Sequence, residues 1–385
     1  MSNAVSEFKI AMIAPSRIGK TSLVTALLQD TKKLLVDTPL SIKAKDSKTS
    51  ARINQHANQL RASLREREFN AGAMNGTEAP FEFNLLLGGQ GQDDHSLNLK
   101  LLDFPGGWLP NLLYDADNSQ EQRECAAFIR QASMLVLVVD ASLVMEASRS
   151  NEKTAIDTIL QISETEQIVE AWAEERHEVS EEPALIVICP VKCESYFNDN
   201  GGKHDYAEKL YDKIMDVYGP LVDIIKKEKS TRNTEILYMP VDTIGCVEFS
   251  HAEWSDLDKK NATPVFKPSF RVRGNGKQSV FGANDILLAV AKQILSFQEK
   301  YQKMIAQLSK KEAENAKNIA KEKGFFEHFY GWFGVETEKE KLAKLAESNA
   351  DEALKAATTT EALMNALGHK KYGTRVKELN KAEKT

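Results

Sequence analysis

The sequence has few cysteines, no long apolar run and no internal repeat, and each absence excludes a class of protein. Its four cysteines form no CxxC pair and no disulfide framework, which is typical of a reduced cytosolic protein. No apolar run approaches the ~18–20 residues that span a bilayer. The N-terminus also lacks the basic start and apolar core of a secretory signal. We therefore expect a cytoplasmic protein, with peripheral membrane attachment left open.

The charge of the chain is weak and unevenly distributed. The net charge of −6 over 385 residues argues against a protein that coats nucleic acid, so no nucleic-acid partner is expected. From Lys292 onward there are 18 Lys and Arg against 14 Asp and Glu, whereas the preceding residues are acidic overall. The tail therefore differs in composition from the body.

Short apolar runs alternate with amphipathic segments. This pattern predicts a three-layer α/β fold, with a mostly parallel sheet between two layers of helices. The runs 134–139 and 184–189 are apolar throughout, as in central strands buried on both faces. The runs 81–87 and 97–102 are separated by a stretch rich in turn residues, which predicts a hairpin. The expected strands are 8–14, 81–87, 97–102, 134–139, 184–189 and 236–241. The expected helices are 46–68, 120–131, 151–178 and 206–226, with one directly after residue 20 and one from about 285.

Residues 14–21, A-P-S-R-I-G-K-T, match the phosphate-binding pattern G-x-x-x-x-G-K-[ST] except at Ala14. A strand precedes the pattern and a helix follows it, so backbone N–H groups at the helix N-terminus can face an anion. Lys20 can reach the β- and γ-phosphates, and the Thr21 hydroxyl can bind Mg²⁺. The nucleotide-binding residues predicted here are Ala14, Ser16, Arg17, Ile18, Gly19, Lys20, Thr21 and Ser22.

A second signal, Asp103-Phe104-Pro105-Gly106, lies at the end of the strand 97–102. A carboxylate at that strand end can hold Mg²⁺ directly or through water. Gly106 can offer its backbone N–H to a γ-phosphate. The pattern D-x-x-G alone is a weak match, and it becomes strong when it follows a phosphate-binding loop.

With these two motifs, residues 8–298 resemble a divergent P-loop GTPase of the translation-factor-related (TRAFAC) class, with features of dynamin-like and guanylate-binding proteins. The resemblance implies a P-loop NTPase sheet that binds GTP or GDP with Mg²⁺, and it also covers divergent GTPases of bacterial multi-gene systems. It places a GTPase domain at 1–298, with a long switch-region insertion at about 30–76. Residues 299–385 then form a helical extension with an aromatic turn at 324–335 and a loose end marked by Gly368 and Gly373.

The family uses a switch threonine to complete Mg²⁺ coordination, and Thr77 lies at the matching place. Thr38 and Thr49 compete for this role. The predicted metal ligands are therefore Thr21, Thr77 and Asp103.

The family recognises guanine through [NT]-K-x-D after a buried strand, and here the sequence reads Val191-Lys192-Cys193-Glu194. Lys192 can pack along the base, and Glu194 can accept two hydrogen bonds from guanine. Thr243 lies where the family places its second base-contacting loop. Val191 and Glu194 depart from the pattern, so ATP remains an alternative to GTP.

Hydrolysis requires stabilisation of charge on the transferred phosphoryl group. No glutamine follows the D-F-P-G motif closely. Arg17 lies where guanylate-binding proteins carry an internal arginine finger, so we expect Lys20, Arg17 and Thr77 to be the catalytic residues, with Arg17 acting on dimerisation.

The leading expectation is a GTP-binding and hydrolysing switch that signals to a protein partner, with a nucleotide-dependent homodimer as one form. One alternative is a nucleotide-binding scaffold with little turnover. Another is a dynamin-like membrane-associated GTPase that uses residues 324–335 to reach a membrane surface.

Overall fold

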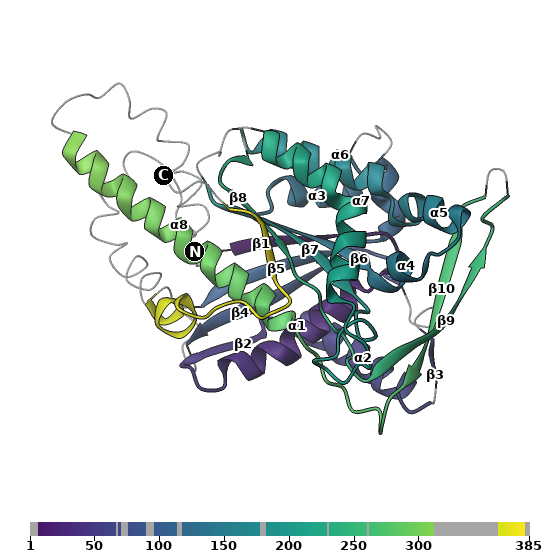
Figure 1. Cartoon of the computed structure of the whole chain (residues 1–385). Coiled ribbons are helices and arrows are strands. Elements are labelled where there is room, and N and C mark those ends of the chain that lie inside the picture. Colours follow the sequence, from purple (N-terminus) through teal and green to yellow (C-terminus); the bar gives the residue numbers. More distant parts are fainter. Residues whose placement is uncertain are drawn as a thin grey trace.

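The chain folds around one eight-stranded sheet (Figure 1). The computed structural model describes residues 7–66, 68–70, 76–89, 96–113, 118–177, 182–228, 231–259, 262–311 and 361–381. The order of the strands is β11-β8-β7-β6-β1-β5-β4-β2. The strands are β1 (Glu7–Ile13), β2 (Leu40–Ala44), β4 (Phe81–Gly89), β5 (Leu97–Asp103), β6 (Met134–Asp140), β7 (Ala184–Val191), β8 (Thr234–Tyr238) and β11 (Lys377–Asn380).

The middle of this sheet is parallel and its edges are antiparallel. Strands β5, β1, β6, β7 and β8 pair in parallel, in that order. The predicted hairpin is confirmed, because β4 pairs antiparallel with β5. Every residue of β6 and β7 is buried, which explains their continuous apolar sequence. The predicted α/β class with a mostly parallel sheet is therefore correct.

The helices fall into two groups, one on each face of the sheet, consistent with a three-layer α/β fold (Figure 1). In the first group, α1 contacts both α2 and α8. In the second group, α6 contacts α3, α5 and α7, and α4 contacts α5 and α7. The helices are α1 (Lys20–Leu35), α2 (Ser47–Ser63), α3 (Gln120–Arg130), α4 (Ala141–Glu146), α5 (Ser150–Leu160), α6 (Ile162–Glu175), α7 (Ala207–Lys227) and α8 (Ala283–Lys311).

The helical segment expected over 151–178 is present, but it is divided into two helices, α5 and α6. Gln161 has a φ of 50°, in the left-handed region, and it ends α5 and begins α6. A left-handed residue cannot continue a right-handed helix, so the segment becomes two helices.

A second, three-stranded sheet joins two regions that are far apart in the sequence. It consists of β3 (Glu68–Asn70), β10 (Val265–Val272) and β9 (Val247–Ser255), in that order. A separate apolar cluster lies beneath it, made of Leu60, Leu64, Phe69, Ile244, Cys246, Val247 and Phe270. Much of the predicted insertion at 30–76 is therefore regular structure, namely β2, α2 and β3.

The chain after Gly368 is not a loose end. Strand β11 pairs antiparallel with β8, and Leu363 and Leu367, which precede it, are fully buried. The long helix α8 also runs across the predicted boundary at 298/299. The aromatic turn predicted at 324–335 lies outside the described residues. Within the described part of the chain, no helix is long and apolar enough to cross a membrane.

Candidate functional site

The site is built at the end of β1, where the chain turns into α1. Gly19 has a φ of 125° and directly precedes α1, so this position requires the backbone freedom of glycine. Ala14 is buried and does not have a positive φ. The glycine of the usual pattern is therefore not needed at position 14, and alanine fits the turn without strain.

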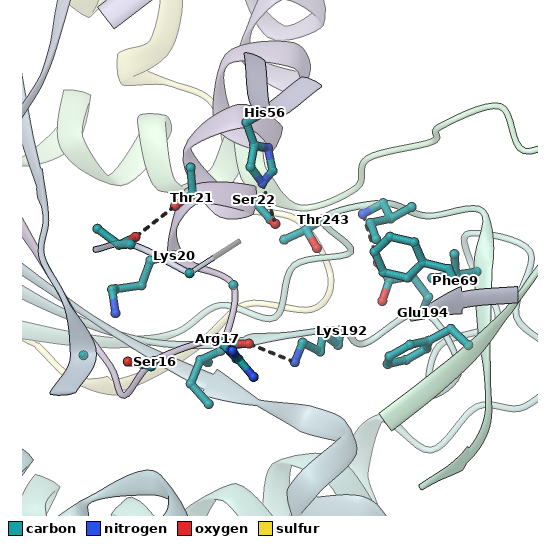
Figure 2. Close-up of a pocket in the computed structure, with 18 residues that line it drawn as sticks. Ser16, Arg17, Lys20, Thr21, Ser22, His56, Phe69, Lys192, Glu194 and Thr243 are labelled. Carbon is teal, nitrogen blue, oxygen red and sulfur yellow. Dashed lines mark hydrogen bonds between the residues drawn. The ribbon is translucent and has the colours of Figure 1, made fainter. Parts of the chain in front are cut away.

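Lys20 is folded back over this turn. Its side chain is buried, and Nζ donates to the carbonyl oxygens of Ala14 at 2.8 Å and Pro15 at 3.2 Å. Burial lowers the pKa of Lys20, and the negative charge of Asp103 opposes that shift. The lysine is thus held against the turn between β1 and α1 (Figure 2).

Three predicted metal ligands converge beside Lys20. Asp103 Oδ2, at the end of β5, accepts from Thr21 Oγ1 at 2.7 Å and from Thr77 Oγ1 at 2.9 Å. The two hydroxyl oxygens are 3.4 Å apart. Asp103 Oδ1 is buried, and it has no hydrogen-bond partner among the described residues.

This donor set suits Mg²⁺, which prefers oxygen ligands and usually shares its coordination between protein, water and phosphate. In the described part of the chain, no three His, Cys, Asp or Glu side chains group into a metal site. A cation at Thr21, Thr77 and Asp103 would therefore need further oxygen atoms from another molecule. The unpartnered Oδ1 of Asp103 is the one observation that a purely structural cluster leaves unexplained.

The competing threonines have structural roles instead. Thr38 Oγ1 donates to Leu35 O at 2.9 Å at the end of α1. Thr49 Oγ1 donates to Asp46 and accepts from Asn84 N, which ties α2 to β4. Only Thr77 of the three lies next to Thr21.

Gly106 lies against the turn between β1 and α1. A Cβ atom at this position would lie 2.1 Å from both Pro15 C and Ser16 N. Only glycine permits this approach, so the D-F-P-G segment is held against the loop at residues 15 and 16. A cavity opens at this end of the sheet, and its lining includes Ser16, Arg17, Ile18, Gly19, Lys20, Thr21, Ser22, Gly106 and Thr77.

Lys192 joins the phosphate-binding loop to the predicted base-binding side. Its Nζ donates to Asp140 Oδ2 and to Arg17 O, the latter at 3.4 Å (Figure 2). Val191 is fully buried, and its Cγ2 packs near Gly19. The Lys192 side chain therefore links the end of β7 to the turn before α1.

Glu194 lies in the same cavity, with one oxygen bonded and one unpartnered. Oε1 accepts from the backbone N–H of Ile244 at 3.0 Å and Gly245 at 3.2 Å. Oε2 is buried without a hydrogen-bond partner among the described residues. Burial, together with the negative charge of Asp242, raises the pKa of Glu194 to about 7. Thr243 is buried and also lines the cavity.

The far wall of the cavity was not anticipated from the sequence. Phe69 of β3, Phe270 of β10, Ile244 and Val247 line it. The ring centroids of Phe69 and Phe270 are 6.4 Å apart. The cavity is thus polar at the phosphate-binding loop and apolar at the opposite end, which suits a ligand with a charged end and a flat apolar part.

His56 is another residue of the cavity that the sequence did not reveal. It lies on α2, and its ring nitrogens are 3.3 Å from Ser22 Oγ and 3.1 Å from Thr25 Oγ1 (Figure 2). Burial, together with the positive charge of Arg52, lowers its pKa to about 4. The neutral ring therefore joins the predicted insertion to the first turns of α1.

His56 makes folding sensitive to acid. Because its pKa is about 4 in the folded protein and ~6.5 when unfolded, its stabilising contribution is complete above pH ~6.5 and is lost as the pH falls toward 4. The wild type should lose stability when the pH falls from 7 to 4. We expect His56→Gln to lose about 1–3 kcal/mol less unfolding free energy than the wild type over this range. Urea unfolding at several pH values measures this. The control is His177→Gln, at an exposed position; an equal effect there would contradict the assignment.

No model of a known protein family matches the chain, and no curated protein sequence matches it either.

Proposed function

We propose that the chain is a divergent P-loop GTPase that binds GTP with Mg²⁺ and hydrolyses it to GDP and phosphate. The observation that carries the proposal is the convergence of Thr21, Thr77 and Asp103 beside Lys20. These residues come from three separate parts of the chain, so their meeting is not a consequence of local sequence. In this proposal the fold is the three-layer P-loop NTPase fold.

Each side of the cavity has a separate task in this proposal. The backbone N–H groups of residues 16–21 and the Lys20 ammonium bind the phosphates. Thr21, Thr77 and Asp103 hold Mg²⁺, which when bound neutralises charge on the β- and γ-phosphates. Lys192 packs along the base, and Glu194 Oε2 accepts from guanine, because that oxygen is buried and has no partner among the described residues.

A switch follows from the position of Thr77 and Gly106. Both lie at the phosphate end of the cavity, and each belongs to a segment that leads away from it: Thr77 into β4, and Gly106 into residues 107–113. Contacts to a γ-phosphate would order these segments. Loss of the γ-phosphate would free them, either to bind a protein partner or to dissociate from one. The GTPase proposal is accompanied by four others. They are a cytoplasmic location, peripheral membrane contact through 324–335, a protein partner and a nucleotide-dependent homodimer.

Arg17 is the candidate for stabilising the transition state. It has a φ of 65°, its side chain is exposed at the cavity, and within the described part of the chain no ion pair holds it. We expect Arg17→Ala to lower kcat at least tenfold with little change in GTP affinity, because a finger acts on charge that develops during transfer. Single-turnover phosphate release and calorimetry measure the two quantities.

The lysine variant provides the control for Arg17. Arg17→Lys keeps the charge and loses the planar fork, so partial activity is expected. An alanine variant with unchanged kcat and unchanged GTP affinity would exclude the finger. Measurements at several protein concentrations separate an internal finger from one supplied in a homodimer.

A scaffold with little turnover is the second candidate, and one observation favours it. Directly after Gly106 the chain places Gly107, Trp108, Leu109 and Pro110, none of which can orient a water through a side-chain carbonyl or carboxylate. Calorimetry with GTP, GDP and ATP in the presence of Mg²⁺, followed by phosphate release, separates the candidates. GTP binding without release favours the scaffold, and tighter binding of ATP than GTP rejects the assignment of Glu194.

A further inference from the structure

Asp242 is a buried residue directly before the cavity residue Thr243, and it forms hydrogen bonds with several parts of the chain. Its side chain is fully buried, and Oδ2 accepts from Arg375 Nη2 at 2.9 Å and Asn200 Nδ2 at 2.9 Å. Its backbone N–H donates to Phe281 O at 3.0 Å. The conformation of the loop that carries Thr243 therefore depends on what Asp242 binds.

Arg375 reaches Asp242 from a segment 133 residues further along the chain. Its side chain is 4% exposed and also forms an ion pair with Asp199, with Nε donating to Oδ2 at 3.0 Å. The guanidinium carbon lies 3.8 Å from the centroid of the Phe197 ring and 4.5 Å from that of Phe281. Two carboxylates and two rings thus fix the guanidinium in one orientation.

The backbone around Arg375 is also anchored to the body of the protein. Gly373 N donates to Asp285 Oδ1 of α8 at 2.9 Å, and β11 pairs with β8. Strand β8 leads within a few residues to Asp242 and Thr243. The segment 361–381 therefore supports the base-binding loop twice, through the neighbouring strand and through the Arg375 side chain.

The charge of Arg375 matters because two buried carboxylates, Asp242 and Glu194, lie near each other. Asp242 raises the pKa of Glu194, so these groups interact. The other groups around Glu194 are Ile244 N and Gly245 N, which donate to it, and the neighbouring Cys193 and Cys246 thiols. Arg273 donates to the carbonyl oxygen of Gly245. Of these cations, Arg375 is the one that pairs directly with Asp242.

We propose that Arg375 is a positioning residue for the base-binding loop, through which the segment 361–381 sets how tightly the site holds its nucleotide base. The inference rests on the proposed GTP function, since it assigns regulation to that same site. Arg375 lines no part of the cavity and acts through Asp242 and Thr243. Its effect is therefore confined to the base and ribose end of the ligand.

The test compares a ligand that has a base with one that has none. Binding of Mg²⁺–GTP and of Mg²⁺–tripolyphosphate is measured by calorimetry on the full chain. Arg375→Met is expected to weaken GTP binding about tenfold and to leave tripolyphosphate binding unchanged. The control is Lys377→Met, two residues later in β11, whose partner Glu208 lies on the surface; there both affinities stay at wild-type values.

Two further measurements keep the test decisive if Arg375→Met unfolds because Asp242 loses its cation. The double variant Arg375→Met with Asp242→Asn removes both charges, and the same selective tenfold loss is expected. In the wild type, GTP must slow amide exchange in residues 373–380, because coupling between the two sites is reciprocal.

Equal losses for GTP and tripolyphosphate in folded variants would show a merely structural role and overturn the inference. Wild-type GTP affinity in both Arg375 variants, or unchanged exchange at 373–380 on GTP binding, would overturn it too, while the proposed function would stand. Absence of GTP binding by the wild type would overturn the proposed function and the inference together.

Discussion

Replacing Lys20 with alanine is expected to weaken GTP binding roughly a thousandfold, the largest effect in the molecule. The reason is geometric: the ammonium is buried at the phosphate-binding loop, bonded to Ala14 O and Pro15 O. No other buried cation among the described residues lines the cavity. Removing it leaves the phosphate charge facing carbonyl oxygens in a site of low dielectric. Calorimetry with Mg²⁺–GTP measures the loss.

The control for this variant is Lys32→Ala, at an exposed position on the same helix. It changes the net charge equally and should leave GTP affinity within a factor of about two, since exposed charges are screened by salt. Thermal unfolding of both variants shows whether they fold. A folded Lys20→Ala protein that binds GTP as tightly as the wild type would contradict the phosphate site itself.

Glu194 is expected to make GTP binding depend on pH near neutrality. Guanine offers two N–H donors, so the carboxylate must be ionised to accept from both. With a pKa of about 7 in the free protein, GTP affinity should be constant well above pH 7 and fall as the pH drops below it, by up to tenfold per unit. Calorimetry between pH 5.5 and 8.5 measures the profile. Glu194→Gln should remove the pH dependence and weaken GTP binding at least a hundredfold at pH 8.

The stability of the empty protein should show the opposite sign. Because the pKa of Glu194 is raised on folding from ~4.5 to about 7, its contribution is full below pH ~4.5 and is lost as the pH rises to about 7. Glu194→Gln should therefore flatten this loss in urea unfolding, and Glu253→Gln, at an exposed position of β9, should not. A pH-independent GTP affinity in the wild type would show that Glu194 does not contact the base.

The phosphate side of the cavity could be predicted from the sequence because its residues stand at the ends of recognisable strands. Strands β1 and β5 are adjacent and parallel, so Asp103 must meet the turn after β1. Thr77 precedes β4, the antiparallel neighbour of β5. Once the strand order is known, the meeting of Thr21, Thr77 and Asp103 follows from topology. The sequence favoured Thr77 by its place before this strand but left Thr38 and Thr49 as competitors, and only the contacts in the folded chain separate the three.

The apolar side of the cavity could not be predicted, because its residues are brought together by long-range pairing. Phe69 belongs to a three-residue strand, too short for a periodic pattern, and it pairs with β10 about 200 residues later. His56 is one polar residue on a polar helix, and only packing against α1 buries it. The break at Gln161 also has no local signal, since glutamine is an ordinary helix former. The strand β11 was missed for the same reason, because four residues cannot be distinguished from a tail.

The pair of Asp242 and Arg375 also constrains the order in which the protein can form. During synthesis the chain grows from its N-terminus, and Asp242 is made 133 residues before its cation. Until then, the eight-stranded sheet lacks its edge strand and Asp242 lacks a charged partner. The nascent body must keep this carboxylate hydrated, since burying it alone would cost several kcal/mol. The loop that carries Thr243, at the cavity, would therefore be completed last, when translation has passed Arg375.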